Sequence, residues 1–440
     1  MISQLLFVVC LAVAGYFLAK SIRRISRNIS LGKAFEPSGD KNERIKQMIL
    51  VAFGQKKMFA RPIPALLHLC VYVGFVLINI EIVEIVVDGL IGTHRIFASF
   101  LGDFYPVVIN FFEGLALLVV LACVIFLIRR NALNIRRFKM PELNKFPLLD
   151  ANLILTIEIG LMFAFLSMNA CDFLLQAFGN EHYTLTGSFA ISKFLVPIYS
   201  GLSAENLELL ERFFWWFHIL GIMAFANYLP YSKHLHIALA FPTTYFSNQE
   251  AKGKIKNMTV VTREVKSMLS IPLDEKEQAE AAAASTEIGR FGAKDVPDLT
   301  WKNLLDAYTC TECGRCSSVC PANVTGKALS PRKIMMDTRD RMEEIGKNIE
   351  LNGSFQDDNK SLYGDYITSE ELLACTTCNA CVDACPVNID PLDIIVQLRR
   401  YRVMEEAKAP DSWNAMFANL ENNQAPWKFS PNDRFNWAKE

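Results

Sequence analysis

Residues 310–321 read CTECGRCSSVCP, and residues 375–386 read CTTCNACVDACP. Both stretches have the pattern C-x2-C-x2-C-x3-C-P. This spacing holds a pair of [4Fe–4S] clusters, and the fourth cysteine of each run then ligates the other cluster. We therefore predict two crossed ligand sets, which would give the chain two centres that carry single electrons. The first set is Cys310, Cys313, Cys316 and Cys385, and the second is Cys375, Cys378, Cys381 and Cys320.

Two other uses of closely spaced cysteines fit this pattern less well. Structural zinc is usually held by two separated C-x2-C pairs rather than by duplicated runs of four with a trailing proline. A disulfide framework needs an oxidising compartment, and the charge pattern described below places these cysteines in the cytoplasm. The other four cysteines lie inside apolar runs, where they are expected to be small buried hydrophobes. They are Cys10, Cys70, Cys123 and Cys171.

Helices are expected on both sides of the cysteine runs. Residues 301–310, WKNLLDAYTC, are amphipathic and lead into the first run. Ser330-Pro331 and Asp390-Pro391 carry capping and first-turn signals, which predict helices over roughly 331–341 and 391–406. The 54 residues between Cys320 and Cys375 exceed the insert of a compact bacterial ferredoxin. They indicate a larger, helical ferredoxin domain.

The chain changes character near residue 240, because the part before it consists of long apolar runs and the part after it is polar and charged. A membrane span needs about 20 apolar residues, and five stretches qualify: 2–19, 63–87, 105–128, 151–178 and 211–231. The predicted fold class is all-α, with a five-helix transmembrane bundle followed by a cytoplasmic two-cluster ferredoxin domain. The predicted boundaries are 1–240 for the bundle, 241–300 for a linker, 301–406 for the ferredoxin-like domain and 407–440 for a tail that contacts a partner.

Basic residues predict the orientation of the bundle. The loops 20–62 and 129–150 carry eleven and six Lys or Arg, whereas the loops 88–104 and 179–210 carry one each. Positively charged loops stay on the cytoplasmic side. We therefore expect a multi-pass protein with its N-terminus outside and its cysteine domain in the cytoplasm. A formal net charge of −1 gives no indication of nucleic-acid binding.

Histidines in the apolar half are candidate haem ligands. His68 lies near the cytoplasmic end of the second span, and His236 lies just beyond that end of the fifth span. Two axial ligands of one b-type haem need such a matched depth. If the fifth helix continues past Pro230, His218 and His236 share one face about 27 Å apart, and His234 points to the opposite side. A hydrogen-bonded packing role is the alternative for any one of them.

A second haem would need a partner for His218 near the outer face, but the second span offers no histidine there, and Ile78, with Asn79 beside it, stands ten residues after His68. His94 and His182 fall in outer loops and would have to fold back. Ionisable residues inside spans are candidates for function. Four glutamates either form a quinone site or proton route or simply line the bundle interior: Glu81, Glu84, Glu113 and Glu158.

The two halves resemble two known families. Five spans, with His68 in a Leu-Leu-His-Leu setting and His218 and His236 at the last span, resemble the cytochrome b (gamma) subunit of respiratory nitrate reductase and related membrane subunits. The segments CTECGRCSSVCPANVTGKALSPRK and LACTTCNACVDACPVNID resemble the C subunit of heterodisulfide reductase. This resemblance implies a fused subunit of a prokaryotic inner-membrane complex, with a quinone as its membrane substrate. The chain departs from the cytochrome b pattern at Ile78.

Longer relatives of this family continue into Cys-Cys-Gly domains, and the sequence contains no such motif. We therefore expect a separate iron–sulfur subunit with that motif, and a flavoprotein as a possible soluble donor. The predicted function is electron transfer between a cytoplasmic partner and quinone, with the substrate site of the oxidoreductase on another subunit. The alternatives are a ferredoxin domain on a redox-inert membrane anchor and a redox sensor.

Overall fold

The structure is a computed structural model of residues 1–440. It describes residues 1–144, 146–179, 182–183, 185–275, 277–279 and 290–439. The described residues form helices and no named strand, with two isolated β-bridges, Lys33↔Thr300 and Tyr363↔Ile367. The predicted all-α class is thus confirmed.

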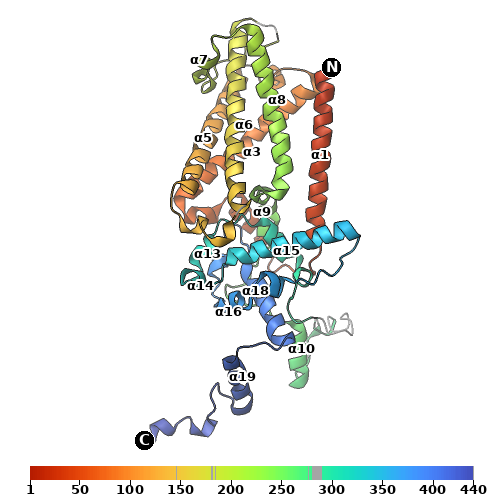
Figure 1. Ribbon diagram of the computed structural model, residues 1–440, viewed down its shortest axis with the longest axis vertical. Coiled ribbons are helices and arrows are strands. Elements are labelled where there is room, and N and C mark those ends of the chain that lie inside the picture. The colour runs from red at the N-terminus through yellow and green to blue at the C-terminus, as the bar shows by residue number, and fades with distance from the viewer. Residues whose placement is uncertain (145, 180–181, 184, 276, 280–289, 440) are drawn as a thin grey trace.

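Five long apolar helices run side by side along the long axis of the molecule (Figure 1). At 1.5 Å per residue each is longer than the hydrocarbon core of a bilayer, which is about 30 Å thick. Many of their apolar side chains face outward, including Leu5, Ile63 and Leu209. Water would penalise such a surface, whereas lipid would not, so the chain is a membrane protein. The helices are α1 (Ile2–Ile29), α3 (Pro62–Ile91), α5 (Tyr105–Asn131), α6 (Phe146–Ala177) and α8 (Ala204–Tyr228).

Helix α6 packs between α5 and α8, α3 packs on α5, and α1 lies at the side of the bundle against α3 and α8. Close approach of α6 and α8 depends on Gly221, where an added Cβ would lie 2.6 Å from the Cδ2 atom of Leu161. Apolar side chains such as Phe165 and Ile219 fill the space between the helices.

The chain turns sharply after α8. Pro230 has no N–H to donate and disfavours helix in the residue before it, so α8 ends at Tyr228. Two short 3-10 turns follow, and α9 (His236–Tyr245) begins a new helix. His218 and His236 would share one face only if the fifth helix continued past Pro230, and this condition is not met.

The C-terminal domain lies at the end of the bundle where α1, α5 and α8 end (Figure 1). Its helices are α12 (Trp301–Thr309), α13 (Arg315–Val319), α14 (Pro321–Val324), α15 (Pro331–Asn352), α16 (Ser369–Ala374), α17 (Ala380–Ala384) and α18 (Pro391–Arg400). As their capping signals predict, Ser330 and Asp390 accept hydrogen bonds from the backbone N–H groups of Lys333 and Asp393. Helix α15 extends eleven residues beyond Arg341, the predicted end.

The core of this domain is formed by α12, α15 and α18 around Leu304, Ile334 and Ile394. Val296 and Leu299, from the predicted linker, are also buried in it, as is Ile25 of α1. The remaining α-helices of the described residues are α2 (Lys41–Met48), α4 (Ile96–Leu101), α7 (Val196–Tyr199), α10 (Thr259–Met268) and α19 (Asp411–Asn423). Helix α19 and the tail that follows it extend away from the domain (Figure 1).

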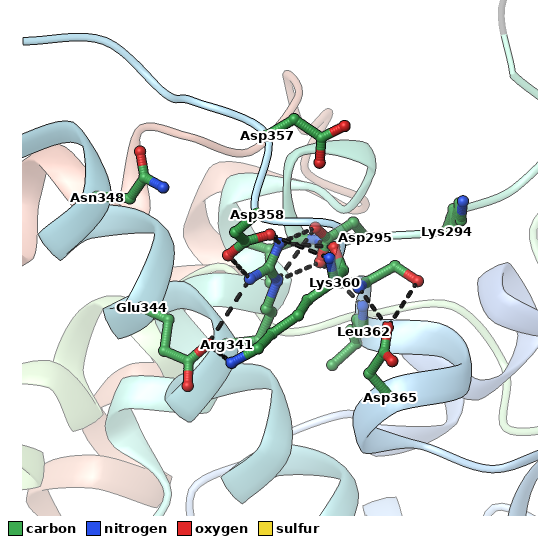
Figure 2. A network of polar contacts seen from close by, with 12 residues as sticks. Lys294, Asp295, Arg341, Glu344, Asn348, Asp357, Asp358, Lys360, Leu362 and Asp365 are labelled. Carbon is green, nitrogen blue, oxygen red and sulfur yellow. Dashed lines mark hydrogen bonds and ion pairs between the residues drawn. The ribbon is translucent and has the colours of Figure 1, made fainter. Parts of the chain in front are cut away.

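A buried arginine joins three segments of the C-terminal domain (Figure 2). Arg341 of α15 is fully buried and donates hydrogen bonds to Asp295 (2.8 Å), Asp358 (2.9 Å) and the carbonyl of Lys360 (2.8 Å). Asp295 in turn accepts a bond from the N–H of Leu362 (3.0 Å). These bonds hold residues 295 and 358–362 against α15.

We expect Arg341→Ala to destabilise the domain by about 3 kcal/mol, because removal of one partner of a buried ion pair leaves the other charge uncompensated. This value is the low end of the usual range, since both carboxylates keep some contact with water. The loss should appear as a lower urea midpoint for bleaching of the iron–sulfur absorbance. Lys347→Ala, at an exposed position of the same helix, should leave the midpoint unchanged. Equal midpoints for both variants would show that the network does not stabilise the domain.

Candidate electron-transfer site

The two cysteine runs have the same backbone conformation. Glu312 and Gly314 in the first run have φ values of 54° and 69°, and Thr377 and Asn379 have 56° and 61° at the matching positions. Left-handed residues between cysteines turn backbone N–H groups toward a common centre, as in other anion-binding loops. At Gly314, where φ is positive, a Cβ would also lie 2.6 Å from the Nη1 atom of the buried Arg332, so a side chain there would strain the backbone and displace that guanidinium.

Each predicted ligand set lines its own cavity. One cavity, here called the bundle-side site, is lined by Cys310, Cys313, Cys316 and Cys385. The other, here called the distal site, is lined by Cys320, Cys375, Cys378 and Cys381, of which Cys381 lies between the two cavities and borders both. The fold thus brings the last cysteine of each run to the cavity of the other run.

The chemistry of these donors fits iron–sulfur clusters. Thiolates are soft ligands, which select zinc or iron–sulfur centres. In the described part of the chain, no group of three or more His, Cys, Asp or Glu side chains is arranged to hold a single metal ion. Backbone N–H groups of Thr377 and Ile389 donate to the sulfurs of Cys375 (3.4 Å) and Cys385 (3.3 Å), as expected for sulfurs that carry negative charge.

Burial makes the free thiols weak acids. It raises the pKa of Cys310 to about 12 and that of Cys385 to about 11. Ligation requires thiolates, so assembly of a cluster must release protons from these sites.

The bundle-side site contacts the loops that join the long helices. Arg61 donates to the hydroxyl of Ser318 (2.8 Å), and Arg315 donates to the carbonyl of Lys57 (3.3 Å). Fully buried Arg332 pairs with Glu142, from the α5–α6 loop, at 2.8 Å. Helix α13 accordingly lies against the bundle, whereas α16, which precedes Cys375, lies farther from it (Figure 1).

Two histidines lie close together near the contact between the bundle-side site and the bundle. The ring centres of His68, in α3, and His236, at the start of α9, are 6.3 Å apart. Two imidazoles bound to opposite sides of one metal have ring centres about 6 Å apart, since each metal–nitrogen bond is about 2 Å long. The Nδ1 of His68 is bonded to Gln55 Oε1 (3.0 Å), and that of His236 to the Lys233 carbonyl (2.7 Å). Because each Nδ1 is the donor, each Nε2 keeps its lone pair for a metal.

His234 does not point away from His236, as a continuous helix would require. Its ring lies 6.0 Å from that of His236 and 5.5 Å from that of Phe225. Its Nδ1 is buried without a hydrogen-bond partner. Because the break at Pro230 places both histidines on the same side, helix periodicity gives no reason to prefer His236. The ring geometry and the Nδ1 bond of His236 favour it instead.

His218 stands apart from the other histidines, which form the groups His68, His234, His236 and His94, His182. It is buried in α8, its Nδ1 is bonded to the Leu161 carbonyl (2.9 Å), and its ring faces Phe165. His94 and His182 do lie together at the other end of the bundle, with ring centres 5.4 Å apart.

That other end contains a buried polar network that includes two of the four candidate glutamates, Glu84 and Glu113, together with residues that were not among the candidates. Arg95 donates to Asp172 (2.6 Å) and to Asn169 (2.7 Å), and Asn169 donates to Glu113 (3.1 Å). Glu84 accepts from Tyr105 (2.9 Å). The sequence contained one signal of this network, since Asn169 and Asp172 interrupt an apolar run and a charged residue inside a span needs a partner.

The 4Fe–4S dicluster domain family matches residues 309–389, a range that contains both cysteine runs. Together with the five apolar helices, this match makes the chain a membrane iron–sulfur protein with a role in electron transfer.

Curated relatives support this class. The chain is 28% identical over its full length to the probable iron-sulfur-binding oxidoreductase FadF of Bacillus subtilis, and it covers 61% of that protein. It is 24% identical over 91% of its length to the EtfAB:quinone oxidoreductase of Syntrophomonas wolfei and covers 55% of it. Over 34% of its length it is 33% identical to a probable membrane-anchored ferredoxin of Chromohalobacter salexigens, 24% of which is covered. No solved structure matches.

Proposed function

We propose that this chain conducts electrons between a soluble redox partner and membrane quinone through two [4Fe–4S] clusters and one b-type haem. The observation that carries this proposal is the contact between the bundle-side site and the loops next to His68 and His236. When bound, the clusters and the haem accept and release single electrons. The side chains described here hold these groups, orient them and exclude water.

The crossed cysteine sets are our proposal for cluster ligation, and His68 and His236 are our proposal for the axial haem ligands. Gln55 and the Lys233 carbonyl would fix the ring orientation of these histidines. His218 has no histidine opposite it among the described residues, so we propose one haem rather than two.

The names of the relatives support the choice of partners. One relative is named as an oxidoreductase of EtfAB and quinone, and we propose an electron-transfer flavoprotein and a quinone for this chain. Glu84 and Glu113, which lie in the polar network of Arg95 at the end of the bundle away from the iron–sulfur domain, would then serve a quinone site or proton route. The tail exposes Trp427, Phe429 and Trp437, which supports contact with a further iron–sulfur subunit that carries Cys-Cys-Gly motifs.

The distribution of charge supports an orientation with the iron–sulfur domain in the cytoplasm and the N-terminus outside. The strongly basic loops lie at the same end of the bundle as that domain (Figure 1), and basic loops stay inside.

Metal analysis and a pyridine haemochrome spectrum of the purified protein test the composition. We expect about eight non-haem irons and about one b-type haem per chain. Protein with zinc in place of iron would overturn the cluster assignment. Full iron without haem would leave the alternative of a redox-inert anchor.

A further inference from the structure

Basic side chains gather around the bundle-side site. Arg315 lines the cavity of this site. Arg137 lies beside Gly314, which stands between the proposed ligands Cys313 and Cys316 in the sequence. Arg61 and Lys57 reach the same region from the loop before α3, where they bond to Ser318 (2.8 Å) and to Asn388 (2.9 Å). In the part of the chain that the structure describes, none of these four makes an ion pair with a carboxylate. Two guanidinium nitrogens of Arg137 are buried without a partner.

The carboxylates near this site do not cancel that charge. Glu142 is paired with Arg332, which adds no net charge. Glu312, whose side chain is buried, pairs with Arg339 and Lys233 at 2.8 and 2.7 Å. These two cations also pair with Asp340 and Asp150, so this network leaves one formal negative charge against the four cations that have no carboxylate partner. The bundle-side site is therefore positively charged overall.

The distal site has a different environment. No described residue that lines its cavity is charged. Two charged groups near the site have opposite signs: Arg399 donates to the carbonyl of Cys375 (2.5 Å), and the Asp390 carboxylate lies within electrostatic range of Cys381. Solvent exposure of the cysteines does not distinguish the two sites. All four bundle-side cysteines are half-buried, whereas the distal set has two buried, one half-buried and one exposed.

We propose that this charge asymmetry gives the bundle-side cluster the higher reduction potential, so that electrons pass from the distal cluster toward the membrane. A [4Fe–4S] cluster on four thiolates is anionic and gains one negative charge on reduction, and nearby positive charge stabilises that form. In this step one electron leaves the reduced distal cluster and enters the oxidised bundle-side cluster, and no bond forms or breaks. The electron is supplied by the reduced flavoprotein of the proposed function. The inference rests on the ligand sets of the proposed function.

Redox titration of the full-length protein, followed by electron paramagnetic resonance, tests this order. The variant Cys378→Ser marks the distal cluster by altering its signal. We expect the unaltered signal to belong to the cluster of higher potential. The inference is overturned if the marked cluster is the first to be reduced.

A second variant tests whether the positive charge beside the bundle-side cluster raises its reduction potential. Arg315→Gln should reduce the ratio of reduced to oxidised bundle-side cluster about tenfold at a fixed potential, which is 59 mV for one electron. The distal cluster should keep its potential. Arg315→Lys, which keeps the charge, should restore most of the ratio, and Lys347→Gln, an exposed position, should change neither cluster. Equal shifts of both clusters, or none, would overturn the inference.

The same samples distinguish this inference from the proposed function. Wild-type protein with fewer than two clusters would contradict the proposed function. Two intact clusters in the opposite order of potential would contradict the direction alone.

Discussion

Replacement of His68 or His236 by alanine is expected to remove the b-type haem and to lower quinone reduction more than about 100-fold. The loss of residues that only orient a ligand already costs about 10- to 100-fold in affinity or activity, and loss of a ligand costs more. The iron–sulfur clusters should remain, because neither histidine lines their cavities. The haem content of each purified variant, relative to its iron content, measures the effect.

Gln55→Leu and His234→Ala distinguish residues that bind the haem from residues that only orient a ligand or pack beside it. Gln55 is bonded to the Nδ1 of His68, so its loss should weaken haem binding about tenfold without abolishing it. His234→Ala should retain the haem. If His234→Ala loses the haem and His236→Ala keeps it, the ligand assignment is wrong. If both His68 and His236 variants still reduce quinone at the normal rate, the bundle is an inert anchor.

Crossed ligation makes a prediction of similar size for the cysteines. Cys385→Ala should remove the same cluster as Cys310→Ala, although Cys385 belongs to the other run. Cys320→Ala should remove the same cluster as Cys378→Ala. Iron should fall from about eight to about four per chain in each case, and electron transfer to quinone should stop because the path is interrupted. Paramagnetic resonance of the remaining cluster identifies which one is lost.

Uncrossed ligation gives a different pattern. In that case Cys385→Ala would remove the cluster that Cys378→Ala removes, and the bundle-side signal would persist. The cavities disfavour this outcome, because Cys385 borders only the bundle-side site and Cys320 only the distal site.

Much of the fold follows from local sequence patterns. The five apolar runs predict the five long helices because length and composition alone decide whether a helix can span a bilayer. Ser330-Pro331 and Asp390-Pro391 predict the starts of α15 and α18, since capping depends on neighbouring residues. The far end of α15 was not predicted, because its last turns depend on tertiary contacts such as that of Gly346 with Asn28 of α1.

The candidate site is predicted only in part. Cysteine spacing gives the cluster motif and its crossed sets, because both are properties of the sequence run. The positions of His234 and His236 depend on how the chain bends at Pro230, and the periodicity of a helix carries no information on that bend. The network of Arg95, Asp172 and Asn169 joins segments far apart in the sequence, so its pairing becomes visible only in three dimensions.

Stopped-flow spectroscopy of the wild-type protein in quinone-containing vesicles follows the proposed electron path in time. When a reduced electron-transfer flavoprotein is added, we expect bleaching of the iron–sulfur absorbance first, then reduction of a b-type haem, then reoxidation of both by quinone. His236→Ala should show only the bleaching. Quinone reduction at the same rate in protein that contains no haem would show that electrons do not pass through a haem.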